Sequence, residues 1–265
     1  MNAIAFRAEL LDAAAEPYRD AGVFARYFAR GKLAGDPVFF ALLRRRLIPD
    51  RARILDLGCG QGLLAAFLSA AERLHAQGRW HSDWPAPPAA LEFRGIELMA
   101  NDVARARKAL GSRIEVQHGD IRGTAFGGAD VVMILDVLHY IDTADQNAVL
   151  GRVLAALSGD GVLLLRVGDA SAGLRFRISQ WVDYIVMFAR RHRLPRLHSR
   201  PLREWIESLE RLGFEVEAAP MSEGTPFANV LLVARLGESG AGTARTTQST
   251  EQCRGNTEKY DLDLS

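Results

Sequence analysis

Cysteine and long apolar runs are both scarce in this sequence. Only two of its 265 residues are cysteines, Cys59 and Cys253, and they fit neither a disulfide framework nor a metal-binding spacing. A reducing compartment is therefore expected. The amino-terminal residues carry charges throughout, unlike a secretion signal, and no stretch approaches the roughly 20 apolar residues of a membrane-spanning helix. We expect a soluble, cytoplasmic protein without a transmembrane segment.

The sequence also lacks an excess of charge of either sign. It has 33 lysines and arginines against 32 acidic residues, a net charge of +1, so it has no overall attraction to nucleic acid or to an anionic membrane. One local group of arginines stands out: Arg190, Arg191, Arg193, Arg196 and Arg200. Without a known RNA-binding module, such a group is only an electrostatic footprint. No nucleic-acid partner is expected.

Short apolar runs alternate with helical stretches from Arg53 onward, as in a parallel sheet covered by helices on both faces. Five such runs predict strands at 53–58, 91–98, 114–120, 129–136 and 161–168. Two more, at 214–220 and 227–236, flank a turn-forming segment and predict an antiparallel hairpin. The expected fold is α/β, a doubly wound Rossmann-like sheet of seven mainly parallel strands with a C-terminal antiparallel hairpin.

The two ends of the chain differ from this pattern. Residues 1–50 predict a helical extension, because apolar residues recur at helical spacing around a break at Gly31, Gly35 and Pro37. Residues 237–265 are polar and small, too poor in apolar content to offset the entropy of ordering. We expect a lid or substrate-binding extension at the amino end and a disordered tail at the carboxyl end.

The sequence ILDLGCGQG, residues 54–62, closes an apolar strand with Asp56 and then places Gly58, Gly60 and Gly62 at alternate positions. Glycines let a ligand approach the backbone and let the next helix begin at once. Dinucleotide-binding turns usually have the spacing Gly-x-Gly-x-x-Gly. The alternate spacing therefore favours a ligand other than a nicotinamide cofactor but does not exclude one.

Acids also mark the ends of the next two predicted strands, at Glu97 and Asp120. Ligands of open doubly wound sheets bind at the carboxyl ends of the strands, so these acids should lie near Asp56. Glu97 can accept hydrogen bonds from both ribose hydroxyls, and Asp120 can accept one from an adenine amine. Leu98 and Ile121, which directly follow the two acids, are expected in the same site, with Ile121 beside the ring face.

This combination resembles the class I S-adenosylmethionine-dependent methyltransferases over residues 51–236. The resemblance implies S-adenosyl-L-methionine as cofactor, with Asp56 helping to hold its methionine amino group and the glycine turn facing its methionine part. Cys59 lies in that turn and is expected beside the cofactor as a small filler. The resemblance also implies a ribose contact by Glu97 and an adenine contact by Asp120, and it matches the terminal hairpin. No metal site is expected.

The segment LDVLHYID, residues 135–142, resembles the part of that family that lines the methyl-transfer site, commonly with a histidine at the position of His139. Its ordinary pKa near 6.5 would let it take a proton from the acceptor; alternatively it has a positional role. Asp136 would either approach the methionine end of the cofactor or cap the following turn. The sequence lacks the Asn-Pro-Pro-Tyr motif that is typical of enzymes methylating exocyclic amines of bases or glutamine amides. Oxygen, carbon or carboxylate acceptors are therefore favoured.

Two inserted segments bear on the acceptor. Residues 75–90, with Trp80 and Trp84, predict a loop that is either a flap near the substrate or a surface decoration. Residues 171–203 pair an apolar helical stripe with the arginines at its end. This insertion lies where class I methyltransferases often build the acceptor pocket. It would suit a hydrophobic acceptor with an acidic group, or one on an acidic carrier protein; alternatively it packs in the core.

Residues 17–43 also resemble methyltransferases of aryl-polyene and related acyl pigment pathways, which favours a hydrophobic acceptor. In that interpretation Tyr18, Tyr27 and Phe28 belong to a lid; alternatively they pack the helices onto the sheet. The expected function is methyl transfer to a small acceptor, at oxygen. The alternatives are an NAD(P)-dependent oxidoreductase, an RNA methyltransferase and a non-catalytic partner protein. The oligomeric state is not predicted.

Overall fold

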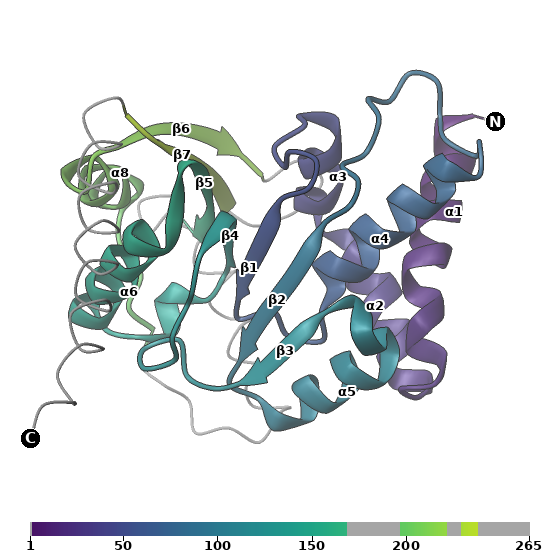
Figure 1. Ribbon diagram of the computed structural model, residues 1–265, viewed down its shortest axis with the longest axis horizontal. Coiled ribbons are helices and arrows are strands. Elements are labelled where there is room, and N and C mark those ends of the chain that lie inside the picture. Colours follow the sequence, from purple (N-terminus) through teal and green to yellow (C-terminus); the bar gives the residue numbers. More distant parts are fainter. Residues whose placement is uncertain (1, 169–196, 222–228, 238–265) are drawn as a thin grey trace, which may run out of the picture.

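The computed structural model describes residues 2–168, 197–221 and 229–237. A sheet of seven strands lies at its centre, in the order β3-β2-β1-β4-β5-β7-β6 (Figure 1). The first five strands are parallel, and β7 runs antiparallel to both β5 and β6. The strands are β1 (Arg53–Leu57), β2 (Glu92–Glu97), β3 (Glu115–His118), β4 (Ala129–Leu135), β5 (Leu157–Gly168), β6 (Phe214–Pro220) and β7 (Asn229–Leu236). The predicted doubly wound sheet with a closing hairpin is confirmed.

Helices cover both faces of this sheet (Figure 1). One face carries α1 (Ala3–Ala15), α2 (Val23–Gly35), α3 (Pro37–Arg44), α4 (Leu63–Ala76) and α5 (Ala100–Leu110), and the other carries α6 (Thr143–Ala156) and α8 (Leu202–Arg211). Among the described residues, three short 3-10 turns lie in the connections between elements: η1 (Glu16–Arg19), η2 (Gly111–Arg113) and η3 (Leu138–Tyr140). Alternate strand residues feed the two cores, so that Ile54 packs under the first group and Leu55 under the second.

Strand β5 begins earlier than its apolar run predicts. Leu157 pairs with Ala129, but the next paired residues are Val162 and Val131, so the intervening residues of β5 form a bulge. A side chain at Gly161 would place its Cβ 2.9 Å from the Ser158 carbonyl oxygen. The polar, glycine-containing start of β5 therefore extends the sheet where the hydrophobic pattern gives no signal.

The predicted helices at the amino end are present, but the break falls at one place only. Gly31 lies inside α2, and the chain turns at Gly35 and Asp36. There the Asp36 side chain caps α3 by accepting a hydrogen bond from the Val38 amide, at 3.2 Å. Pro37 at the first helical position suits this start, because its missing N–H would have no partner there.

Helix α2 buries two alanines and a leucine and exposes two of its aromatic side chains. Ala25, Ala29 and Leu33 face the core, whereas Phe24 and Tyr27 are 68% and 74% exposed. The two alanines let α2 pack closely against its neighbours. The aromatic stripe of this helix is therefore available to a ligand or partner.

The loop that follows α4 packs against the amino-terminal helices. The rings of Trp80 and Trp84 meet Phe6 of α1 edge to face, with centroids 4.9 and 5.2 Å apart, and Trp84 also meets Phe40 of α3. The loop precedes the amino end of β2, at the sheet edge opposite the carboxyl ends of the strands. Trp84 is therefore buried in the core and Trp80 packs against it, whereas more than half of residues 75–90 are exposed, so the role of this loop stays a prediction.

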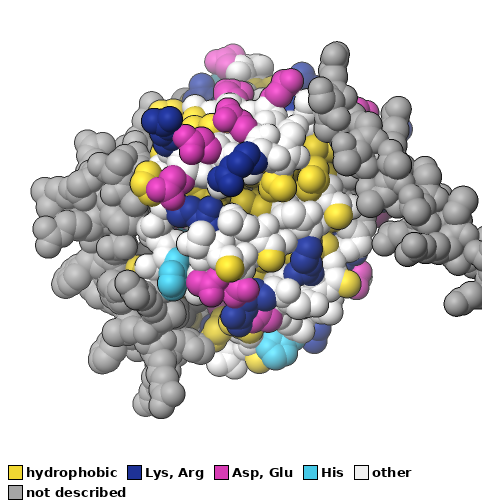
Figure 2. Space-filling view, turned by 90° about the vertical axis from the view of Figure 1, so that its left-hand side faces the viewer, with side chains coloured by type: hydrophobic (Ala, Val, Ile, Leu, Met, Phe, Trp, Pro, Cys, Tyr) yellow, Lys and Arg dark blue, Asp and Glu magenta, His cyan; other side chains and the backbone are white. Residues whose placement is uncertain are grey.

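The face that carries α6 and α8 mixes acidic and basic side chains, and neither sign gathers in its described part (Figure 2). The Arg203–Glu207 pair of α8, at 2.6 Å, is an example. Four of the five arginines named above lie outside the described residues, as do most of 171–203 and the tail after Gly237. Within the described ranges, no helix is long and apolar enough to cross a membrane.

Candidate functional site

Two buried carboxylates meet at the carboxyl ends of β1 and β2. Asp56 pairs in register with Gly95, so Glu97, two residues further, lies on the same face of the sheet. Burial and the neighbouring charge of Glu97 raise the pKa of Asp56 to about 7. Glu97 accepts two backbone hydrogen bonds, both at 2.8 Å, from the amides of Gly60 and Met99. The predicted meeting of these two acids is thus present in the structure.

The three alternate glycines differ in what a side chain would meet at each position. All of them have positive φ, which only glycine adopts readily. A Cβ at Gly58 would overlap Val137, and one at Gly62 would come within 2.8 Å of Leu110. A Cβ at Gly60 would meet no atom within 4 Å. The outer glycines are needed for packing, whereas the middle one leaves open space beside the carboxylate of Glu97.

Cys59 fills the place of a missing side chain on β2. A Cβ at Gly95 would lie 2.5 Å from the Cys59 Sγ atom, so the thiol occupies that volume. Burial, and the nearby carboxylates of Asp56 and Glu97, raise the pKa of this free thiol. The structure thus places Cys59 as an unreactive filler. Gly95 was not predicted as part of the site, although a glycine inside an apolar strand indicates that another group approaches the backbone closely.

The amino-terminal extension holds the glycine turn. The hydroxyl of Tyr18 in η1 donates to the Gln61 carbonyl oxygen at 2.7 Å, and both residues are buried. Burial raises the pKa of Tyr18, so its hydroxyl stays protonated as a donor. Tyr18 therefore packs the extension onto the sheet, which leaves the exposed Tyr27 and the half-buried Phe28 for the predicted lid.

These residues fit an S-adenosyl cofactor by the chemistry of their donors and acceptors. The Asp56 carboxylate accepts no hydrogen bond from the described residues, although it is buried. A buried acid without a donor favours binding of a cation. The methionine ammonium of the cofactor would supply such a cation, and the open space at Gly60 lies beside the second carboxylate, that of Glu97.

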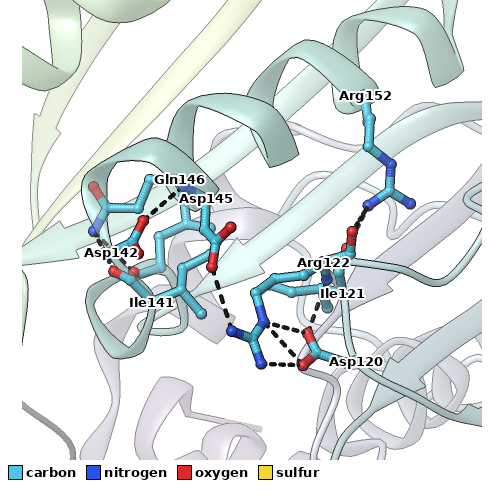
Figure 3. Close-up of polar contacts among 9 residues, drawn as sticks. Asp120, Ile121, Arg122, Ile141, Asp142, Asp145, Gln146 and Arg152 are labelled. Atoms are coloured by element: carbon cyan, nitrogen blue, oxygen red, sulfur yellow. Dashed lines mark hydrogen bonds and ion pairs between the residues drawn. The ribbon is translucent and has the colours of Figure 1, made fainter.

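Asp120, predicted beside the adenine ring, is held by an arginine two residues away (Figure 3). The Arg122 Nε and Nη2 atoms lie 2.9 and 2.6 Å from Asp120 Oδ2, and this pairing lowers the pKa of Asp120. Nη1 of Arg122 reaches Asp145 in the first turn of α6, at 3.3 Å. A carboxylate has about four lone-pair positions, so Asp120 remains able to accept an amine. Arg122 is a residue of this site that the sequence pattern did not predict.

The two apolar residues of the predicted adenine site differ in exposure. Leu98 is 60% exposed, and its carbonyl oxygen lies 3.0 Å from His118 Nε2. Ile121 is buried, and its carbonyl oxygen accepts from Arg152 Nη1 at 2.7 Å (Figure 3). The side chain of Leu98 is therefore open to solvent just beyond the carboxyl end of β2.

Asp136 belongs to a buried charge network. Arg166 of β5 is 2% exposed and pairs with Asp136 on one side and with Asp36 of the amino-terminal extension on the other. Burial works to raise the pKa of Asp36, but Arg166 and Lys32 outweigh it and lower it to about 2. The side chain of Asp136 does not cap η3, which begins after Val137 without a side-chain cap. Arg166 was missed, although a charged residue inside an apolar strand requires a partner.

His139 lies in η3, directly after β4. Burial lowers its pKa, against the opposing effect of Asp136. Its imidazole is therefore neutral at pH 7, the form that a general base requires. The backbone carbonyl of His139 accepts from the His198 amide at 2.8 Å, and its ring meets Tyr140, with centroids 4.1 Å apart.

A second buried polar cluster contacts the backbone of η3. Gln146 of α6 donates to the carbonyl oxygens of Leu138 and His198, at 3.0 and 2.8 Å, and accepts from Arg200 Nε at 2.5 Å. The Arg200 guanidinium also stacks over Trp205, 4.6 Å from the ring centroid. Arg200 was expected with the arginines that could meet an acidic acceptor, and that expectation is wrong because it is buried in these structural contacts.

Comparison with known proteins identifies the family. A family described as a methyltransferase domain matches residues 26–219 of this chain. The chain belongs to this methyltransferase family. This confirms the predicted class I methyltransferase, and with it S-adenosyl-L-methionine as cofactor, over the nicotinamide oxidoreductase.

Within the described residues, no cluster of three His, Cys, Asp or Glu side chains could hold a metal ion.

Two curated relatives of this methyltransferase illustrate the similarity. A carboxy-S-adenosyl-L-methionine synthase of Chromohalobacter salexigens is 34% identical over 129 residues, which cover 47% of this chain and 43% of that protein. A mitomycin biosynthesis 6-O-methyltransferase of Streptomyces lavendulae is 35% identical over 115 residues, 43% of this chain and 29% of that protein. The chain thus matches less than half the length of either relative.

Solved structures show the same fold. Magnesium protoporphyrin IX methyltransferase from Synechocystis PCC 6803, solved with bound SAH, superposes with a TM-score of 0.54 at 19% identity, covering 84% of this chain and 92% of that one. A mitomycin 7-O-methyltransferase superposes with a TM-score of 0.53 at 25% identity, covering 80% of this chain and 57% of that one.

Proposed function

We propose that this methyltransferase transfers a methyl group to an oxygen of a small hydrophobic acceptor, free or bound to a carrier. The observation that carries the proposal is the pair of buried carboxylates, Asp56 and Glu97, beside the open space at Gly60. In this proposal Asp56 binds the ammonium of the cofactor and Glu97 binds its ribose hydroxyls. Asp120 accepts from the adenine amine.

Leu98 and Ile121 flank the adenine ring in this arrangement, and Cys59 and the three glycines of the turn line the methionine part. Asp136, which pairs with Arg166, lies near the methionine end of the bound cofactor in this proposal. The methyl donor supplies an activated sulfonium, so most of the catalysis comes from holding the acceptor in line within a dry pocket. Holding the acceptor in line requires rigid surroundings. Two clusters of the described residues supply them: the Arg166–Asp136 pair and the hydrogen bonds of Gln146 to the backbone near η3.

The half-buried His139 supports oxygen as the accepting atom. Its lowered pKa keeps the imidazole neutral, so a ring nitrogen can take the proton that a hydroxyl acceptor releases. Relatives named for 6-O and 7-O methylation agree with this proposal. The exposed Phe24 and Tyr27 of α2 support a hydrophobic acceptor, because they would form the apolar surface of a lid.

Glu97→Ala is expected to weaken S-adenosylhomocysteine binding about 10- to 100-fold, because a hydrogen bond to a charged acceptor contributes roughly 1.5 to 3 kcal/mol. Isothermal titration calorimetry measures the change. Glu92→Ala is the matched control, since Glu92 is exposed at the opposite end of the same strand, and its affinity should stay within about twofold. Equal affinities of the Glu97→Ala variant and the wild type would remove Glu97 from the site.

His139→Ala is expected to lower turnover about 100-fold, the smaller end of general-base effects, while S-adenosylhomocysteine affinity changes little. Release of S-adenosylhomocysteine over a panel of phenolic and carboxylic acceptors measures turnover, and mass spectrometry of the product identifies the methylated atom. Turnover equal to wild type on the accepted substrate contradicts the role of His139 as base.

A further inference from the structure

Arg122 joins two acidic side chains that come from different elements, at the predicted adenine site (Figure 3). Its Nε atom lies 3.1 and 2.9 Å from the two carboxylate oxygens of Asp120, and Nη2 lies 2.6 Å from Oδ2. The Arg122 amide also donates to Asp120 Oδ1, at 2.9 Å. Nη1 reaches Asp145 of α6 at 3.3 Å. One edge of the guanidinium therefore holds Asp120, and its remaining nitrogen contacts Asp145.

A second arginine, Arg152 of α6, fixes the backbone of the same loop. Its guanidinium donates to three carbonyl oxygens there, those of Ile121, Arg122 and Thr124. Asp145 and Arg152 lie about two helical turns apart on one face of α6. The loop after β3 is thus fastened to α6 twice, at its backbone and through the side chain of Arg122.

The pair of Arg122 and Asp120 lies partly in solvent. The two side chains are 52% and 33% exposed, and ion pairs of this kind add little to the stability of a fold. A fork of two donors nevertheless fixes the direction of a carboxylate as well as its charge. The same hydrogen bonds lower the pKa of Asp120, so its carboxylate stays charged as an acceptor. The effect of Arg122 is therefore local to one acceptor of the site.

We propose that Arg122 is a positioning residue of cofactor recognition, which holds the Asp120 carboxylate ready for the exocyclic amine of adenine. This inference rests on the proposed function, in which Asp120 accepts from that amine, and deepens it. An acceptor that is already ordered loses less side-chain freedom when the amine binds. A purine nucleoside without the amine has no use for the ordered carboxylate. Arg122 thereby strengthens the preference for adenine over other purines.

The test compares S-adenosylhomocysteine with its 6-deamino analogue, in which a hydrogen atom replaces the exocyclic amine. Isothermal titration calorimetry of the wild-type chain should show a preference of about 10- to 100-fold for S-adenosylhomocysteine, the effect of one hydrogen bond to a charged group. Arg122→Gln is expected to lower this preference about 3- to 10-fold, because binding must then order the Asp120 side chain. Only S-adenosylhomocysteine should weaken, and the affinity of the analogue should stay within about twofold.

Two further variants serve as comparison and control. Asp145→Asn should lower the preference by less than Arg122→Gln does, since Arg122 then loses its contact with α6 but keeps Asp120. Arg113→Gln is the matched control, because Arg113 is exposed in η2, just before the opposite end of β3. It should leave the preference within about twofold of the wild type.

A double variant shows whether Arg122 acts through Asp120. Once Asp120→Ala has removed the acceptor, adding Arg122→Gln should not change the remaining preference. A further change in this background overturns the inference, and so does an Arg122→Gln protein that keeps the wild-type preference, weakens both ligands equally or binds S-adenosylhomocysteine more tightly. A wild-type chain that binds both ligands equally contradicts the adenine contact of the proposed function, and the inference fails with it.

Discussion

Arg166→Met is expected to lower the free energy of unfolding by about 3 to 5 kcal/mol, the cost of removing one partner from a buried ion pair. The change leaves Asp136 without its cation and leaves Asp36 paired with Lys32 alone. The Arg166 side chain that is replaced is only 2% exposed. It also separates the amino-terminal extension from β5, because Asp36 is the extension's charged contact there. Urea denaturation at pH 7 measures the effect.

The matched control for this network is Arg203→Met. Arg203 makes an exposed pair with Glu207 one helical turn away, and such pairs contribute roughly 0 to 1 kcal/mol. Adding Asp36→Asn to Arg166→Met should restore part of the lost stability, since one unpaired acid is removed. An Arg166→Met protein as stable as the Arg203→Met protein would show that the network does not hold the two layers together.

Asp56→Asn is expected to stabilise the ligand-free protein at pH 8 by up to about 4 kcal/mol and to have little effect at pH 4. The pKa of Asp56 is about 7 in the fold and 3.8 in the unfolded chain, and each unit of difference corresponds to about 1.4 kcal/mol. Because the folded state binds the extra proton between these values, stability falls as pH rises from about 4 to 7. Asparagine removes this loss, and urea denaturation at both pH values measures it.

The same change is expected to weaken S-adenosylhomocysteine about 10- to 100-fold at pH 8, because the ammonium loses its charged partner. Wild-type affinity should rise between pH 6 and 8, as Asp56 ionises. The exposed Asp20 provides the control, Asp20→Asn, which should change neither stability nor affinity. An Asp56→Asn protein that is less stable than wild type at pH 8 would show that Asp56 already has a native donor.

Together the two predictions separate residues that hold the fold from those that hold the ligand. Arg166 is paired on both sides and serves stability. Asp56 is buried without a donor and costs stability until a cation binds. A site that is destabilising in the free protein is common where binding or catalysis requires it.

The strands and the acids at their ends could be predicted because their signals are local. A run of apolar residues marks a buried strand, and the next residue lies at the sheet edge, as Asp56 and Glu97 show. Parallel pairing then places the two on one face without further information. The alternate glycines of the turn are equally local, since their positive φ is a property of the turn itself.

The charge networks could not be predicted, because their members are distant in sequence. Asp36 and Arg166 are 130 residues apart, and Gln146 and Arg200 are 54 apart. Nothing in the composition near Arg200 distinguishes a buried arginine from a solvated one. Trp84 was equally ambiguous, since its packing on Phe6 depends on where α1 folds back. Such partners follow from tertiary packing and not from local propensity.

A crystal structure of the chain with S-adenosylhomocysteine tests the central claim most directly. The account predicts the ribose hydroxyls within hydrogen-bond distance of the Glu97 carboxylate, the ammonium at Asp56 and the adenine amine at Asp120. Ligand bound away from the carboxyl ends of β1 and β2, or with its ribose out of reach of Glu97, would contradict it.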